Sequence, residues 1–291
     1  MERISVFGSL ACVLAALLAC KGTSESSTTA PNTSVAVAAT AIKSNDITFV
    51  KGVPKAGTKV DQSMKATFKF TLGGTVYRSE QEKAANIDVQ AADEFRVTKA
   101  AIDVKTLVET NQEGTAAEKR SVNPLAGSRY VLSRTDEGKL SALTSSGSPV
   151  PAATLAQLKE HFGDVVEKDK TREFIPTRPV KLGEKLNPSS DVVLKLLGEK
   201  DDGETKVDGV EFILDNGSTG EKATFNVSMT FTTKLDAQTR LRAKLDGTID
   251  VRPKDSEVTA VSLKGPLTIL DAGGNEKGTG DMTFSGSESA K

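Results

Sequence analysis

The sequence predicts a mainly β protein of the β-rich α+β class. We expect an antiparallel meander shaped as a half-barrel or a sandwich, with one or two short helices near the middle of the chain. Three observations lead to this prediction: strict alternation of apolar and polar residues, glycine-rich turns between the alternating segments, and helical spacing confined to the middle. Strands with one wet face and one dry face are typical of antiparallel sheet.

Alternation is clearest at residues 64–72, 223–232 and 240–251, and it continues through 261–269. The residues predicted to face inward are Met64, Ala66, Phe68, Phe70, Leu72, Ala223, Phe225, Val227, Met229, Phe231, Leu241, Ala243, Leu245, Ile249, Val251, Val261, Leu263, Leu267 and Ile269. Turn sequences at residues 73–74, 215–217 and 273–275 predict hairpins between neighbouring strands. A meander of hairpins follows from these signals.

Helical spacing begins after Pro151, where Leu155, Leu158, Phe162 and Val165 would share one face. A second, shorter helix is predicted at residues 191–197, between a serine N-cap and a glycine. These helices form a connector, residues 150–198, between a first β-rich half at 46–149 and a second at 199–291. Both halves contain the tetrapeptide Lys-Ala-Thr-Phe, which fits either an internal duplication or chance.

The N-terminus reads as a secretory signal peptide, residues 1–19, because its apolar run is shorter than the roughly 20 residues that span a bilayer. The run ends in Leu17-Leu18-Ala19-Cys20, which resembles the lipobox of bacterial lipoproteins. That resemblance implies cleavage before Cys20, a diacylglyceryl group on its thiol, and therefore membrane lipid as a partner. The alternative is an ordinary secreted protein in which Cys20 is a stray thiol.

Residues 20–45 are predicted to be the lipidated N-terminus and a disordered, Ser/Thr-rich tether, since their composition cannot bury enough apolar surface to fold. The chain has two cysteines, and Cys12 lies in the discarded peptide, so the mature body would contain no disulfide. Lys21 stands where enteric lipoproteins that stay at the inner membrane have aspartate. By that resemblance we expect a cell-envelope location, with the outer membrane favoured over the inner.

An anchor, a tether and a long meander covered by helices resemble the half-barrel lipoprotein carriers of the bacterial envelope. Residues 179–184, Pro-Val-Lys-Leu-Gly-Glu, also resemble a turn of uncharacterised envelope lipoproteins, interpreted here as a bend at Gly183 into an edge strand. The resemblance implies a concave sheet that takes a lipophilic ligand or an envelope protein. The residues predicted to face such a ligand are Phe68, Phe70, Phe225, Met229 and Phe231. Among them, Phe225 is predicted to be core and Met229 to lie nearer a pocket.

The sequence lacks the residues that nucleic-acid binding, histidine catalysis or metal binding would require. Lysine plus arginine total 38 against 39 acidic residues, without a basic block, so no nucleic acid is expected as a partner. The single histidine, His161, falls beside the apolar stripe and is predicted to be a solvated helix-surface residue without a catalytic role. One histidine and no mature thiol also argue against a zinc or copper site, and no cofactor is expected.

The acidic loops at 201–204 and 271–276 carry oxygen ligands of the kind that calcium needs, but neither fits an EF-hand, and both are interpreted as solvated hairpin tips. A glycosidase carboxylate pair has no sequence signature, and the absence of tryptophan counts against a polysaccharide substrate. Two hypotheses remain: a non-enzymatic binding or carrier module, and a structural or interaction lipoprotein with a closed core. An enzyme is the least favoured class.

Overall fold

The computed structural model describes residues 46–290, except for 51, 53, 94–95, 136, 167–174, 177, 191–204, 219–221 and 236–237. The predicted signal peptide, Cys20 and the tether therefore lie outside the described residues. The second predicted helix at 191–197 and the acidic loop at 201–204 lie outside them as well.

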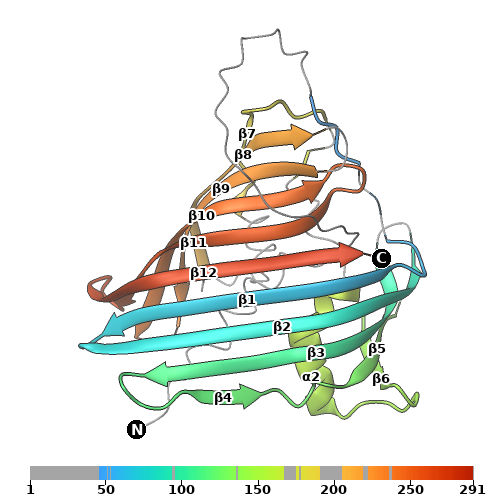
Figure 1. Ribbon diagram of the computed structural model, residues 1–291, viewed down its shortest axis with the longest axis horizontal. Helices are drawn as coiled ribbons and strands as arrows, with labels where there is room; N and C mark the ends of the chain where they lie inside the picture. The colour runs from blue at the N-terminus through green and yellow to red at the C-terminus, as the bar shows by residue number, and fades with distance from the viewer. Residues whose placement is uncertain are drawn as a thin grey trace, which may run out of the picture.

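The described strands form one open, antiparallel 12-stranded sheet, which confirms the predicted fold class (Figure 1). Its order is β6-β5-β3-β2-β1-β12-β11-β10-β9-β8-β7, and β4 pairs with β3 beside this path. The strands are β1 (Lys59–Leu72), β2 (Thr75–Ala92), β3 (Val97–Glu113), β4 (Lys119–Val122), β5 (Arg129–Arg134), β6 (Leu140–Thr144), β7 (Lys185–Leu186), β8 (Thr205–Ser218), β9 (Lys222–Lys234), β10 (Thr239–Arg252), β11 (Glu257–Asp271) and β12 (Glu276–Ala290). Because β1 pairs with β12 along its length, the first and last long strands join the two ends of the meander.

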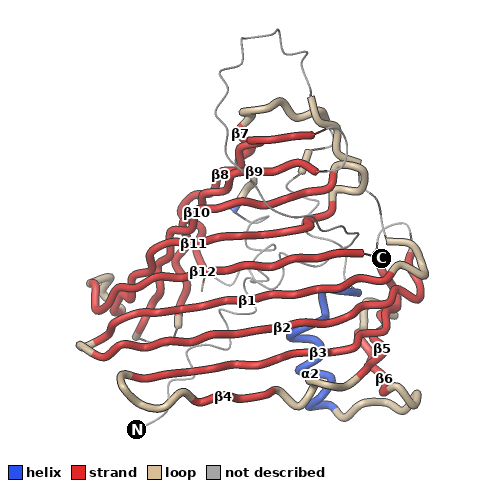
Figure 2. The backbone as a smooth tube through the Cα atoms, viewed as in Figure 1, coloured by secondary structure: helices blue, strands red, loops and turns tan. Residues whose placement is uncertain are grey.

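The sheet bends into an open trough (Figure 2), and glycines on its concave face permit the bend. A Cβ placed on Gly247 would lie 1.9 Å from the Ser262 carbonyl oxygen, and one on Gly265 would lie 1.9 Å from the Lys244 carbonyl oxygen. Both contacts are with backbone of the neighbouring strand. Glycine is thus required here by close backbone approach, not by an unusual φ.

The helix α2 (Ala152–Phe162) and the short 3-10 helix η2 (Gly163–Val166) cover part of the concave side, and α2 lies behind the strands in Figure 1. The predicted first helix is confirmed. It starts after Pro151, whose φ of −58° suits a helix entry. Leu158 and Phe162 are both fully buried, as their helical spacing predicts.

Two of the three predicted hairpin turns are confirmed. Gly73 and Gly74 connect β1 to β2 with φ of 56° and 81°, and Gly274 lies in the β11–β12 turn with φ of 83°. The turn predicted at residues 215–217 is wrong, because these residues continue β8 through a register shift between Leu214 and Asn216. The same Asn and Gly residues that favour turns also suit a β-bulge.

Gly183 has a φ of 75° and precedes the edge strand β7, which confirms the interpretation of the Pro-Val-x-x-Gly-Glu segment. The Glu184 carboxylate stabilises this bend by accepting hydrogen bonds from the Lys181 backbone N–H at 2.9 Å and from Arg178. The segment predicted as a helical connector, 150–198, therefore also contains a short strand.

Candidate functional site

The concave face holds two separate apolar clusters. The first, called here the large cluster, comes mostly from β1 and β8–β12. Its buried members are Phe49, Met64, Ala66, Phe68, Phe70, Ile175, Val180, Leu186, Val207, Phe212, Leu214, Ala223, Phe225, Val227, Met229, Phe231, Leu241, Ala243, Leu245, Ile249, Val251, Val258, Val261, Leu263, Leu267, Ile269, Met282 and Phe284. The second, called the helix cluster, joins β2, β3, β5 and β6 to Leu158, Phe162, Val165 and Val166 of α2 and η2. The trough thus has a helix-covered part and a part lined by the large cluster.

The five residues predicted to face a ligand all lie together in the large cluster. Phe225 has an exposed fraction of 0% and Met229 of 3%, so burial does not distinguish the predicted core residue from the predicted pocket residue. Neither of them lines any of the three cavities found near β1 and β2. Their assignment as ligand-facing residues stays a prediction.

A short segment, residues 46–50, packs on the large cluster and is called here the strap. Ile47 exchanges backbone hydrogen bonds of 2.8 and 2.9 Å with Val180, and the Phe49 ring lies 5.7 Å from the Phe225 ring. Farther along, the Val50 N–H donates to the Pro253 carbonyl at 2.8 Å. The strap connects the β7 side of the trough with the β10–β11 turn.

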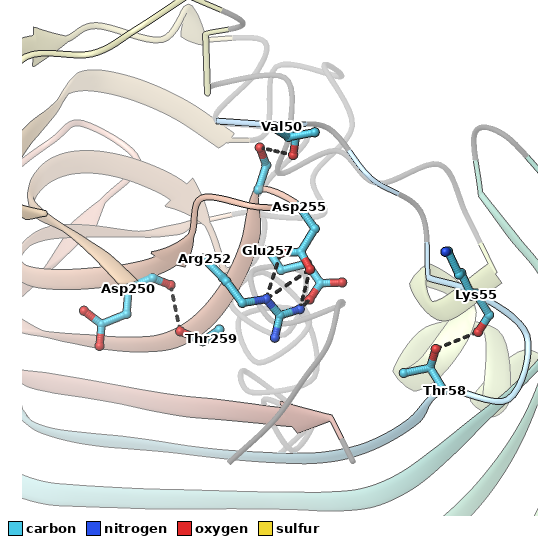
Figure 3. Close-up of polar contacts among 9 residues, drawn as sticks. Val50, Lys55, Thr58, Asp250, Arg252, Asp255, Glu257 and Thr259 are labelled. Atoms are coloured by element: carbon cyan, nitrogen blue, oxygen red, sulfur yellow. Dashed lines mark hydrogen bonds and ion pairs between the residues drawn. The ribbon is translucent and has the colours of Figure 1, made fainter. Parts of the chain in front are cut away.

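Figure 3 shows Val50 of the strap near Arg252, Asp255 and Glu257 of that turn. The Ser256 hydroxyl donates to the Val50 carbonyl at 2.9 Å, and Ser256 has a φ of 58°, a conformation that non-glycine residues rarely adopt. Beside it, the Arg252 guanidinium is bound by Asp255 and by the buried Glu257. These paired charges are satisfied within the turn, so we interpret them as a structural support for the strap.

A polar cavity of about 370 Å³ lies between α2 and strands β1–β4, next to both clusters. Its lining residues are Met64, Gln81, Glu82, Lys83, Leu107, Val108, Glu109, Ser121, Val122, Asn123, Pro124, Gln157, Glu160 and His161. The sheet places Gln81 opposite Glu109 and Lys83 opposite Leu107, so β2 and β3 supply adjacent polar and apolar walls. Met64 belongs to the large cluster as well as to this lining.

Lys83 is 3% exposed, and its ammonium donates to the His161 carbonyl at 2.5 Å. The same nitrogen lies 4.5 Å from the centre of the Phe162 ring. Carbonyls in the last turn of a helix have no helical partner and carry partial negative charge, so a cation there is stabilising. Lys83 therefore fastens the C-terminal end of α2 to the sheet, a contact that alternation alone did not reveal.

The prediction that His161 is a solvated surface residue needs correction, because its side chain is half-buried and lines the polar cavity. Burial lowers the pKa of the imidazole, nearby Lys83 lowers it further, and Glu160 opposes both effects. The ring is therefore neutral at pH 7. In the described part of the chain no group of three His, Cys, Asp or Glu side chains could hold a metal ion.

Comparisons with known proteins name no family. No family model matches the chain, and no curated protein matches it. The solved structures that resemble it include lipovitellin, studied for lipid–protein interactions, with a TM-score of 0.36 and 8% identity over 81% of this chain and 25% of that chain. This chain thus spans about a quarter of the lipovitellin chain.

Two further solved structures resemble the chain. One is DynF from the dynemicin biosynthesis pathway of Micromonospora chersina, with a TM-score of 0.25 and 9% identity over 86% of this chain and 92% of that chain. The other is the translocator domain of the autotransporter NalP from Neisseria meningitidis, with a TM-score of 0.20 and 13% identity over 81% and 89%. Such low scores support no functional argument. Among the described residues, no helix has the length and apolar character needed to span a membrane.

Proposed function

We propose that this protein is a lipid-anchored envelope protein whose concave sheet binds a lipophilic ligand, without catalysing a reaction. The observation that carries the proposal is the large cluster: a continuous apolar surface on the inside of an open sheet. In the helix cluster a helix covers the corresponding surface. Among the described residues, the large cluster is covered by the strap and by Ile175 and Val180.

A short strap is a cover that a ligand can replace. The strap contributes the side chains of Ile47 and Phe49 to the large cluster, and burying such a side chain is worth about 1.5–3 kcal/mol. An acyl chain of many methylenes, at about 0.8 kcal/mol for each one buried, exceeds that contribution. Relative to water, burial of the acyl chain therefore outweighs burial of the two strap side chains.

The anchor in this proposal is Cys20, because the lipobox resemblance ends there. One acyl chain binds a bilayer only marginally, whereas a diacylglyceryl group with a further acyl chain makes release slow. Replacing Cys20 with Ser should abolish metabolic labelling by palmitate and release the protein into the soluble fraction. Unchanged labelling would contradict the anchor without affecting the ligand-binding proposal.

The ligand is tested by organic extraction of the purified protein followed by mass spectrometry. We expect a lipid in a ratio of about one per protein, and we expect Met229→Ala to reduce the amount retained, since Met229 lies in the large cluster. Lys65→Met, at the opposite, exposed face of β1, is the matched control and should leave retention unchanged.

A structural protein with a closed core is the second candidate, and the complete burial of Phe225 and Phe231 favours it. It predicts no extractable lipid, and losses of stability on truncation of Phe225 and Met229 that are both as large as for ordinary core residues. Absence of lipid in the parent protein together with those losses would replace the carrier proposal by this one.

A further inference from the structure

We infer that the polar cavity beneath α2 receives the head of the bound amphiphile and selects an uncharged, hydroxyl-rich head over an anionic phosphate. This inference rests on the proposed function, because it assumes that the acyl part lies on the large cluster. Met64 is the link between the two regions, since it belongs to the large cluster and lines the cavity.

The size of the cavity suits a head group. Its volume of about 370 Å³ is at the lower end of the range of roughly 300–1,000 Å³ for small-molecule sites. At about 30 Å³ of liquid volume per water, it corresponds to roughly a dozen waters. That space fits a glycerol or a single sugar and leaves no room for two acyl chains.

Its walls carry many groups that hydrogen-bond to hydroxyls. Gln81, Gln157, Asn123 and Ser121 supply both donors and acceptors, and they come from three parts of the chain: β2, the β4 region and α2. The Asn123 oxygen also accepts from the Leu125 backbone N–H at 2.9 Å. Several neutral donors and acceptors that converge on one space suit the hydroxyl groups of a polyol.

The next residue pair along the same two strands is also polar. Ser79 and Asn111 are opposite each other on β2 and β3, one step beyond the pair of Gln81 and Glu109. The Ser79 hydroxyl is in a side chain with an exposed fraction of 0%, and among the described residues neither it nor the Asn111 carbonyl oxygen has a hydrogen-bond partner. Buried polar atoms in folded proteins are normally satisfied, so the polar character of the inner face continues beyond the lining of the cavity.

Charge argues against an anionic head. The charged residues that line the cavity from the inner face are Glu109, Glu160 and Lys83. Glu82 also belongs to the lining, but its carboxylate pairs with Lys65 at 3.0 Å on the outer face of the sheet. The Lys83 ammonium is already bound to the His161 carbonyl at 2.5 Å. Two carboxylates therefore face the cavity against one ammonium group. A phosphate would therefore be repelled by Glu109 and Glu160, and this repulsion is stronger near a protein interior than in water.

The test compares two fluorescent lipids with identical acyl chains, a galactosyl diacylglycerol and a phosphatidylglycerol, binding to the full chain in neutral detergent micelles. We expect the galactosyl probe to bind about tenfold more tightly, the effect of roughly one well-made hydrogen bond or one close repulsion. The parent protein alone provides this comparison, so the result does not depend on a variant that folds.

Variants then locate the effect. Glu109→Gln combined with Glu160→Gln should strengthen binding of the phosphatidylglycerol probe about tenfold and narrow the preference. Gln81→Leu should weaken the galactosyl probe, whereas Gln90→Leu, an exposed position on the same strand, should not. Thermal unfolding of each variant confirms that it is folded.

Equal binding of the two probes, or tighter binding of phosphatidylglycerol, would overturn the selection of a neutral head and leave the proposed function standing. Binding of neither probe, with no lipid extracted from the purified protein, would overturn both.

Discussion

The two parts of the trough fill their interiors in different ways. In the large cluster the sheet itself supplies the bulky side chains, namely Phe68, Phe70, Phe212, Phe225, Phe231 and Phe284. In the helix cluster the one sheet aromatic is Tyr130, and Phe162 of α2 supplies the other buried ring. The inward strand residues of the helix cluster are mostly small or branched, and this leaves the space that α2 needs to pack against the sheet. Where no described helix covers the sheet, bulky strand side chains fill the interior instead.

A polar belt separates the two parts. Along the inward face of β1, Val60 belongs to the helix cluster and Met64 to the large cluster, with Gln62 between them. In the strand register Gln62 lies opposite Glu288 on β12, and Lys83 on β2 lies opposite Met64. The belt consists of Gln62, Lys83 and Glu288, and each of them is at most 5% exposed. These buried polar groups lie between the two apolar clusters and keep them distinct, and Lys83 is bound to the His161 carbonyl.

The largest expected effect tests whether the two clusters are energetically independent. Phe225→Ala in the large cluster and Phe162→Ala in the helix cluster should each cost about 3–5 kcal/mol in the free energy of unfolding, through lost burial and an unfilled space. The milder pair Phe225→Leu and Phe162→Leu should add to within about 0.5 kcal/mol when combined, as separate sites do. Denaturant unfolding measures both. A coupling well above that value would mean that the polar belt does not divide the core.

Curvature of the sheet is tested by Gly247→Ala. We expect the free energy of unfolding to fall by about 3 kcal/mol, the upper end of the range for overpacking. The new Cβ would lie 1.9 Å from a backbone oxygen, which cannot move without shifting the strand. Gly209→Ala is the matched control: no atom lies within 4 Å of a Cβ built there, and its stability should change little. Equal urea midpoints for the two variants would show that Gly247 is not needed for close strand approach.

Attachment of the helix is tested by Lys83→Met. The change removes the hydrogen bond to the His161 carbonyl and the positive charge at the end of α2. We expect the free energy of unfolding to fall by about 2 kcal/mol. Hydrogen exchange should accelerate in α2 more than in β8–β12. Lys65→Met removes an exposed ion pair with Glu80 and should cost roughly 0–1 kcal/mol. Uniform acceleration across the sheet would argue that Lys83 supports the whole core and not α2 in particular.

The smallest expected effect is a pH dependence confined to the helix side. The pKa of His161 is lowered in the folded protein, chiefly by burial, so the unfolded chain takes up a proton first as the pH falls below the ordinary value of 6.5. Stability contributed by neutral His161 is present above that pH and is lost as the pH falls toward the lowered pKa. Thermal unfolding of His161→Gln should show a flatter pH profile in this window. An unchanged profile would mean that other groups titrate there.

Several features of the fold could be predicted because they depend on neighbours in sequence. The inward residues Phe68, Phe225 and Leu245 follow from a period of two, and the burial of Leu158 and Phe162 follows from a helical period. The turn assigned to residues 215–217 failed for a local reason: Asn and Gly suit a bulge within a strand as well as a turn. Sequence alone does not distinguish these two uses.

The cavity and its surroundings depend on contacts between residues that are far apart in the sequence. Such contacts could not be predicted from the sequence. Lys83 and His161 are 78 positions apart and meet only because α2 folds back across β2. Gly247 and Gly265 could be recognised as glycines inside strands, a signal of close backbone approach, but the partner strand could not be named. Likewise the helical pattern alone predicts that His161 is a surface residue. The sheet that lies beneath the helix in the folded protein half-buries it.

Alternation, turn glycines and one helical stripe are local consequences of side-chain size and backbone geometry, so the chain sequence was sufficient to establish an antiparallel β protein with a covering helix. Pairing of β1 with β12 brings residues 60 and 290 side by side and assigns Met64 to a cluster with β8–β12, although it is distant from them in sequence. Which strands meet, how the sheet bends and where a cavity remains depend on burying the whole apolar surface at once. That requirement acts on the folded chain and has no signature in any single segment.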